Sequence, residues 1–303
     1  MNLTYILKKI IKRLIIRSLQ NLSLETLSKL DNWNFSMRIH IQEATRKKYV
    51  IKNNAQIAPE IYSYDKIRIL EKSILDKKAS WHGLSLLKRD ICNIPGMLTE
   101  NEKQYYLYIT QFYSGIGCFV ELSPWLGLST YYLVNGLTLN PNFKNQKIHC
   151  FDDFIWRSSW MNKWLKETKI LCPSNHESFK NLFIEQMTSH GIIDNLEVYQ
   201  SKFSDYDGNE NLSYPVWSHQ DSIEIIVVDC GRTLSANEGW WKVFSPSFIK
   251  NRTLVIMQDW QQHKQVPELF YNQTKIFTDS KLDHLELIHE VDEAGIATFL
   301  YRG

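Results

Sequence analysis

The sequence has few cysteines, and they show none of the patterns by which cysteine stabilises a small fold. Its five cysteines are odd in number and scattered over 303 residues, with no CxxC pair and no histidine at metal-ligand spacing. These features argue against a disulfide framework and against a zinc site. We therefore expect a reduced protein of the cytoplasm.

The sequence also lacks an excess of charge of one sign. Lys and Arg are balanced by Asp and Glu to a net charge of +2, which gives no reason to expect nucleic acid as a partner. Apolar residues make up 44% and charged residues 22%, the composition of an ordinary soluble globular protein. At this length we expect one sizeable domain with a smaller extension.

A long uncharged apolar run is missing as well, although residues 1–22 form an amphipathic pattern. The apolar side chains between Leu3 and Ile15 fall on one helical face, and the basic residues between Lys8 and Arg17 crowd the others. Charges interrupt the stretch far below the roughly 20 apolar residues that a bilayer requires, and no signal-peptide cleavage site follows. Two interpretations stay open: peripheral contact with an anionic membrane surface, or self-association and packing on the domain.

Helical patterns continue to about residue 95. We predict an N-terminal helical accessory region over 1–95 and an α/β domain over 96–303, with the boundary near Pro95 in the turn 93–97. Thr99 and Glu102 have the spacing of a capping box for a helix that runs to about residue 113.

After this point, apolar strands alternate with helices. The predicted helices cover 128–137, 175–190 and 234–244, the second with a capping box at Ser174 and Glu177. The predicted strands cover 117–122, 147–151, 196–200, 223–228, 253–257, 284–290 and 296–301. This alternation predicts a doubly wound, mostly parallel α/β sheet, in which ligands bind at the carboxyl ends of the strands.

Carboxylates follow four of these strands and would therefore meet at one edge of the sheet. They are Glu121, the pair Asp152 and Asp153, Asp229, and Asp259 preceded by Gln258. Any one of them can be a solvated loop residue, but their recurrence at the same edge favours a functional site.

Four segments resemble a known family. GCFVELSPWLGLST, KIHCFDDF, IEIIVVDCG and LVIMQDW resemble the motifs of class I S-adenosylmethionine-dependent methyltransferases, most closely the macrocin O-methyltransferase-like group, over residues 98–303. The resemblance implies a Rossmann-like seven-stranded sheet whose last strand is antiparallel. It also implies S-adenosylmethionine as the cofactor, bound by Glu121, Leu122, Ser123, Gly127, Ser129, Thr130, Asp152 and Asp153.

Two positions depart from the family pattern. Ser123 and Trp125 stand where the family has glycines, whose missing Cβ lets the backbone turn tightly beside the cofactor. Gly127 is kept, and the amides of the helix that follows it are suited to hold the carboxylate of the methionine moiety.

The resemblance further implies that Asp229 and Asp259 face the transferred methyl group as catalytic residues. In the macrocin-like group, acids at these strand ends hold a divalent ion, so Asp229, Gln258 and Asp259 are the candidate ligands of an optional Mg²⁺. Because two carboxylates there would repel, an ion, a proton or Arg232 should compensate them. Without metal, His219 or His263 is an alternative base.

Three tryptophans follow the second strand, at Trp156, Trp160 and Trp164. They suit either a lid that stacks on a flat acceptor or the burial of a helix. The sequence thus predicts an O-methyltransferase for a hydroxyl of a small molecule or glycan. A methyltransferase-like binding or assembly module without catalysis is the alternative, and a dinucleotide-binding oxidoreductase is a weaker one.

Overall fold

The computed structural model describes residues 92–303, apart from 145, 204–210, 218–220, 266–268 and 292–293. The accessory region predicted over 1–95 lies outside the described residues except for its end at 92–95. The basic helix predicted over 1–22 lies outside them entirely. Membrane contact and self-association through that helix therefore stay predictions.

One seven-stranded sheet organises the described part of the chain. Its strands are β1 (Cys118–Leu122), β2 (Ile148–Asp152), β3 (Leu196–Gln200), β4 (Ile223–Val228), β5 (Leu254–Met257), β6 (Leu285–Glu290) and β7 (Ala297–Tyr301). Their order is β3-β2-β1-β4-β5-β7-β6, and β7 runs antiparallel to both of its neighbours while the other pairs are parallel. The predicted strand positions, the doubly wound sheet and the antiparallel last strand are confirmed.

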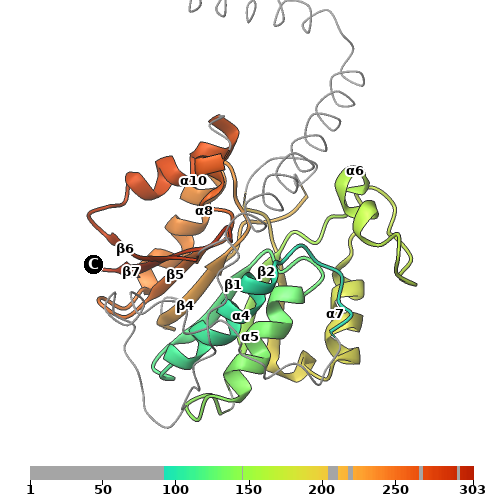
Figure 1. The fold of residues 1–303 in the computed structure, drawn as a ribbon, viewed down its shortest axis with the longest axis horizontal. Coiled ribbons are helices and arrows are strands. Elements are labelled where there is room, and N and C mark those ends of the chain that lie inside the picture. The colour runs from blue at the N-terminus through green and yellow to red at the C-terminus, as the bar shows by residue number, and fades with distance from the viewer. Residues whose placement is uncertain (1–91, 145, 204–210, 218–220, 266–268, 292–293) are drawn as a thin grey trace, which may run out of the picture.

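Helices cover both faces of the sheet (Figure 1). They are α4 (Glu100–Ile109), α5 (Leu128–Thr138), α6 (Ser158–Met161), α7 (Lys180–Ser189), α8 (Leu234–Phe244), α9 (Gln262–Gln265) and α10 (Leu269–Asp279). Short 3-10 turns are Thr110–Phe112, Asn162–Trp164, Ile193–Asn195 and Ser245–Ser247. In Figure 1, α4, α5 and α7 lie on one side of the sheet, and α8 and α10 lie on the other.

The helix predictions were correct in part. The capping box of Thr99 and Glu102 is present at α4, and α8 has the predicted bounds. The helix predicted from 175 begins only at Lys180, because Ser174 and Glu177 bond to each other within a turn that precedes it. The helix α10 was not predicted.

Two hydrophobic clusters fill the space between the sheet and the helices. Alternate side chains of a strand point to opposite faces, so Phe119 packs with α4 and α5 while Val120 packs with α8. The same alternation separates Ile225 and Val227 from Ile226 in β4, whose six residues are all buried. Both faces of the central strands are therefore covered, as a parallel sheet requires.

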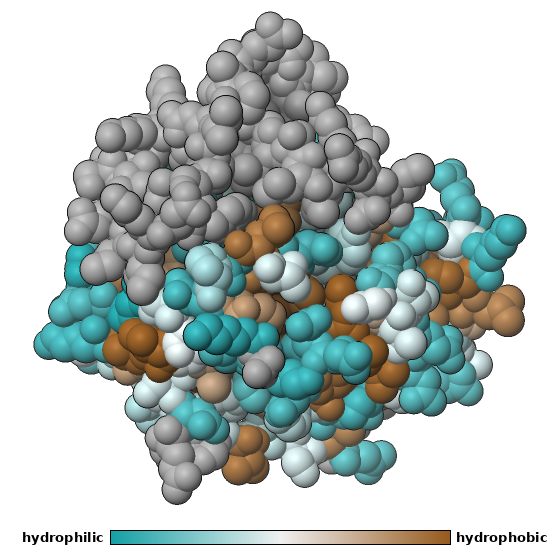
Figure 2. Space-filling model, turned by 90° about the horizontal axis from the view of Figure 1, so that it is seen from below, coloured by the Kyte–Doolittle hydropathy of each residue, from teal (hydrophilic) through white to brown (hydrophobic). Residues whose placement is uncertain are grey.

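Where Figure 2 shows the described residues, hydrophilic residues are interspersed with smaller hydrophobic groups. Among the described helices, none combines the length and the apolar composition needed to span a bilayer.

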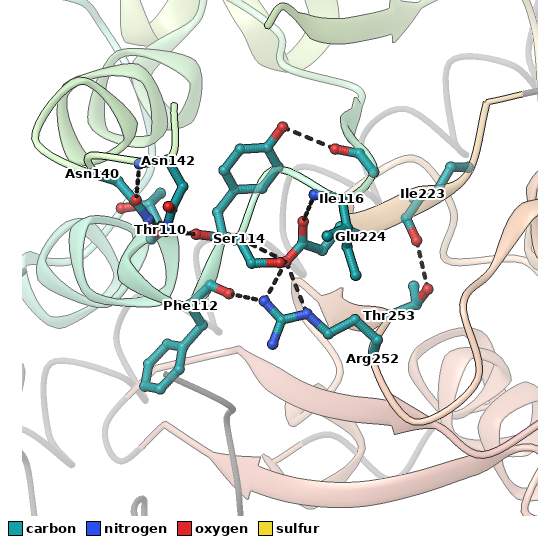
Figure 3. Close-up of polar contacts among 12 residues, drawn as sticks. Thr110, Phe112, Ser114, Ile116, Asn140, Asn142, Ile223, Glu224, Arg252 and Thr253 are labelled. Carbon is teal, nitrogen blue, oxygen red and sulfur yellow. Dashed lines mark hydrogen bonds and ion pairs between the residues drawn. The ribbon is translucent and has the colours of Figure 1, made fainter. Parts of the chain in front are cut away.

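At the amino ends of the strands, a buried ion pair ties the chain preceding β1 to the sheet (Figure 3). Glu224 of β4 is 1% exposed and pairs with Arg252, whose Nε donates to Oε1 at 2.9 Å. The backbone N–H groups of Ser114 and Ile116 donate to the same carboxylate at 2.7 and 3.2 Å, and Arg252 also donates to the carbonyl of Phe112 at 2.6 Å. This network stabilises the edge opposite to the candidate functional site.

Candidate functional site

The turn between β1 and α5 has a left-handed backbone at three alternate positions. The φ angles are 62° at Ser123, 48° at Trp125 and 92° at Gly127. Glycine adopts this region freely, whereas other residues persist there at a cost of about 1–3 kcal/mol when their surroundings enforce it. The two residues that depart from the glycine pattern therefore keep the backbone conformation for which glycine is normally used.

Gly127 is the N-cap residue of α5, and the space beside its Cα is already filled. A Cβ at this position would lie 2.2 Å from Cε of Met187 and 3.1 Å from Cε2 of Phe183, both on α7. Among the described residues, no side chain caps the first turn of α5, which carries the positive end of the helix dipole. Gly127 thus serves the packing of α5 on α7 as well as the shape of the turn.

We expect Gly127→Ala to lower the free energy of unfolding by about 2 kcal/mol, because it adds a clash with Met187 to left-handed strain. Gly191→Ala is the matched control, since Gly191 has a φ of 68° but no atom within 4 Å of the position that a Cβ would occupy. Chemical denaturation of both variants should show the larger loss at Gly127. Equal losses would mean that the contact with α7 contributes nothing.

Glu121 is the second-last residue of β1. It is buried, with 1% of its surface exposed. Ser129 Oγ donates to its Oε1 at 2.5 Å, and Thr130 Oγ1 donates to its Oε2 at 2.7 Å. Burial raises the pKa of Glu121 to about 7, although the hydrogen bonds from Ser129, Thr130 and Cys150 act in the opposite direction. The structure therefore brings together three of the predicted cofactor residues, around a carboxyl group that is costly to ionise.

Asp152 links the end of β2 to the turn after β1. Its Oδ2 accepts the backbone N–H of Trp125 at 3.2 Å, and its Oδ1 accepts that of Phe154 at 2.7 Å. Burial and the charge of Asp153 raise the pKa of Asp152. Asp153 itself forms an ion pair with Arg157 at 2.6 Å. Asp152 thus lies beside the turn, while Asp153 pairs with Arg157 of its own loop, and their role in cofactor binding stays a prediction.

The tryptophans after β2 have different environments. Trp156 is fully buried, and its Nε1 donates to Asn162 Oδ1 at 2.7 Å, so it belongs to the core. Trp160 is half-buried on α6, and its ring centroid lies 5.6 Å from that of Trp125. Trp125 packs against the core cluster, with its Nε1 buried and without a hydrogen-bond partner in the described structure. Among the three tryptophans, Trp160 thus has a ring contact with the turn, through Trp125.

Asp229 follows β4 at the point where the strand order reverses between β1 and β4. Its backbone N–H donates to the carbonyl of Leu122 at 3.1 Å, and the residue is exposed. The pKa of Asp229 is raised well above its ordinary value, because protein atoms crowd the carboxyl group and because Asp259 repels its charge, while Arg232 acts in the opposite direction. Asp229 and Asp259, which follow the neighbouring strands β4 and β5, are thus close enough for their charges to interact, and a site shared by them stays a prediction.

Asp259 forms an ion pair with Arg232, from the loop between β4 and α8. Its φ angle of 59° is also left-handed. Of the two alternative bases, the structure describes His263. It is half-buried, and its Nδ1 lies 2.7 Å from the carbonyl oxygen of Trp260. His219 lies outside the described residues.

Gln258 is part of a buried polar network that the sequence did not reveal. Tyr106 Oη donates to Gln258 Oε1 at 2.7 Å, and Gln258 Nε2 donates to Glu102 Oε1 at 2.9 Å. The backbone N–H of Gly295 donates to the same Glu102 oxygen at 3.0 Å. The capping box identified Glu102 as a helix-terminal residue, but no sequence signal connects it to a strand end more than 150 residues away.

No protein-family model matches the chain, and neither does any curated protein. An O-methyltransferase from Bacillus cereus, solved with SAH, is similar at 12% identity and a TM-score of 0.44, over 76% of this chain and 94% of that one. CalS11, a TDP-rhamnose 3'-O-methyltransferase of calicheamicin biosynthesis, is 13% identical with a TM-score of 0.44, over 77% and 92%. TomG of Streptomyces achromogenes, an O-methyltransferase of tomaymycin synthesis solved with SAM, is 9% identical with a TM-score of 0.43, over 72% and 87%.

These three names do not identify the macrocin-like group, which stays a prediction. At TM-scores below 0.5 these similarities do not indicate an activity for this chain. The residues of the site provide that indication.

Proposed function

We propose that this chain is an S-adenosylmethionine-dependent O-methyltransferase that acts on a hydroxyl group of a small molecule or glycan. One observation carries the proposal: the turn after β1 keeps a left-handed backbone at Ser123, Trp125 and Gly127 and leads directly into an uncapped helix. A strained turn that persists without its glycines indicates that the conformation itself is needed.

The residues around the turn fit a cationic nucleoside ligand with a carboxylate. The first-turn amides of α5, which no side chain of the described residues caps, suit the ligand's carboxylate. Glu121 is buried among hydroxyl groups, and its hydrogen-bond partners in the described part of the chain include no cation, so a nearby ammonium or sulfonium group would favour its ionisation. Leu122, Ser123, Ser129, Thr130, Asp152 and Asp153 complete the proposed cofactor site.

When bound, S-adenosylmethionine supplies a methyl group activated by its positively charged sulfur. The chain's own contribution is to bind and orient the acceptor, because a well-aligned pair of reactants loses little further entropy in the transition state. We infer that Asp229, which follows β4 at the reversal point of the strand order, accepts the proton of an acceptor hydroxyl when it is ionised, and that Asp259, two residues after the end of the neighbouring strand β5, assists it.

One observation favours the alternative of a binding module without catalysis. Both oxygens of Asp152 already accept backbone N–H groups, from Trp125 and Phe154. A carboxylate held in this way can serve the stability of the turn alone, without binding ribose hydroxyls.

Thermal melting of the full chain with S-adenosylmethionine, S-adenosylhomocysteine and NAD distinguishes these functions. A ligand at about 100 times its dissociation constant stabilises the folded state by about 2.7 kcal/mol, which is roughly 5–10 °C in Tm. We expect this shift with the first two ligands and none with NAD. A shift with NAD alone would indicate an oxidoreductase, and no shift with any of the three would favour the binding module.

A further inference from the structure

The three oxygen ligands expected for a divalent ion at this edge of the sheet are not equally available. Gln258 is 8% exposed, its amide oxygen accepts the hydroxyl of Tyr106, and its amide nitrogen donates to Glu102. Turning this amide toward an ion would leave the buried hydroxyl of Tyr106 without its acceptor, at a cost of about 1–3 kcal/mol, whereas Glu102 would keep the N–H groups of Gly295 and Thr99. Both polar atoms of the Gln258 side chain are therefore engaged by residues of α4.

The carboxylate of Asp259 is also engaged, by a cation of the chain itself. Arg232 Nη2 pairs with its Oδ2, and the side chains are 28% and 12% exposed. Arg232 follows Asp229 by three residues, so the loop after β4 brings a positive charge to the strand ends that Asp229 and Asp259 follow. A guanidinium group stays ionised throughout the physiological range and pairs well with carboxylates.

The remaining described residues offer no substitute for these ligands. No group of three or more His, Cys, Asp or Glu side chains in the described ranges is arranged to hold a metal ion. Mg²⁺ prefers an octahedral set of oxygen ligands, and of the expected set only the carboxylate of Asp229 is left to supply one.

We propose that Arg232 takes the place of a divalent metal ion at this site, so that the carboxyl edge of the sheet works without metal. The guanidinium compensates the charge of Asp259 from within the chain and leaves Asp229 available to an acceptor. The role of Asp229 toward an acceptor rests on the proposed function. The binding of metal ions can be tested without a methyl acceptor.

Melting of the full chain with Mg²⁺ or Mn²⁺ and with EDTA tests the proposal. The parent protein should give the same Tm in all three conditions. Arg232→Met removes the cation but keeps an unbranched side chain, and should create a response to Mn²⁺ that grows with concentration. The rise should reach roughly 5–10 °C at about 100 times the dissociation constant, because only the folded state brings Asp229 and Asp259 together.

Two further variants assign the response to the pair. Arg232→Lys keeps the positive charge and should behave like the parent. Adding Asp259→Asn to Arg232→Met should abolish the new response. A parent protein that is stabilised by Mg²⁺ or Mn²⁺ in a way that Asp259→Asn removes would overturn the proposal, whether or not the Arg232 variants fold. A folded Arg232→Met variant that stays insensitive to Mn²⁺ would overturn it too.

The metal titrations can be interpreted independently of whether the proposed methyltransferase function is correct. If S-adenosylhomocysteine leaves the Tm of the parent unchanged, the methyltransferase proposal fails, while the metal titrations of the parent and the Arg232 variants still decide the role of Arg232.

Discussion

Replacing Arg252 with methionine is expected to lower the free energy of unfolding by about 3–5 kcal/mol, the usual cost of leaving one member of a buried ion pair behind. Glu224 is 1% exposed, so its carboxylate cannot reach water to recover the lost interaction. The N–H groups of Ser114 and Ile116 would still donate to it, but no positive charge would compensate it within this network. The fold should lose much of its stability while the opposite edge of the sheet keeps its geometry.

Urea denaturation of the variant gives this value directly. Arg302→Met is the matched control, because Arg302 pairs with Glu286 at the surface, where both side chains are 44% exposed and such pairs contribute about 0–1 kcal/mol. Adding Glu224→Gln to Arg252→Met should recover part of the loss, since it removes the uncompensated charge. If Arg252→Met and Arg302→Met cost the same, the pair at Glu224 is not buried in solution.

A second large effect is expected from pH. The free energy of unfolding should fall as the pH rises from about 5 to about 8, because Glu121 has a pKa of about 7 in the folded protein against 4.5 in the unfolded chain. The folded state therefore binds a proton more tightly than the unfolded state in this range, and stability falls wherever that proton is released. The difference corresponds to about 3 kcal/mol for Glu121.

Asp152 also makes the free energy of unfolding fall as the pH rises, since its pKa is raised by burial and by the charge of Asp153. Glu121→Gln should thus remove part of the pH dependence between about 5 and 8, and Asp152 should maintain the rest. Urea titrations of the parent and of this variant at several pH values measure the difference, and the exposed Glu286→Gln serves as the control that leaves the slope unchanged. A parent protein whose stability is constant or increases over this range would contradict the raised pKa.

The strands could be predicted because each is a short apolar run bounded by turn residues. β3, β4 and α8 have the predicted bounds, and the pairing of β4 with β5 puts Asp229 and Asp259 after neighbouring strand ends, while their shared site stays a prediction. α10 was missed, although Thr274, Phe277 and Thr278 in its second half are buried. The helix beginning at Lys180 was placed too early, because a capping pair was assigned to the helix when it closes a separate turn.

The sequence by itself determined the order of strands and helices and the edge at which the acids collect, since hydrophobic periodicity and the right-handed crossover rule depend only on local pattern. Tertiary structure alone decided which of those acids and amides are engaged. Gln258 bonds to Tyr106 and Glu102, Asp259 pairs with Arg232, and Gly127 packs on Met187. These partners are distant in sequence, and only the packing of α4, α7 and the loop after β4 around the sheet sets the distances on which hydrogen bonds and ion pairs depend.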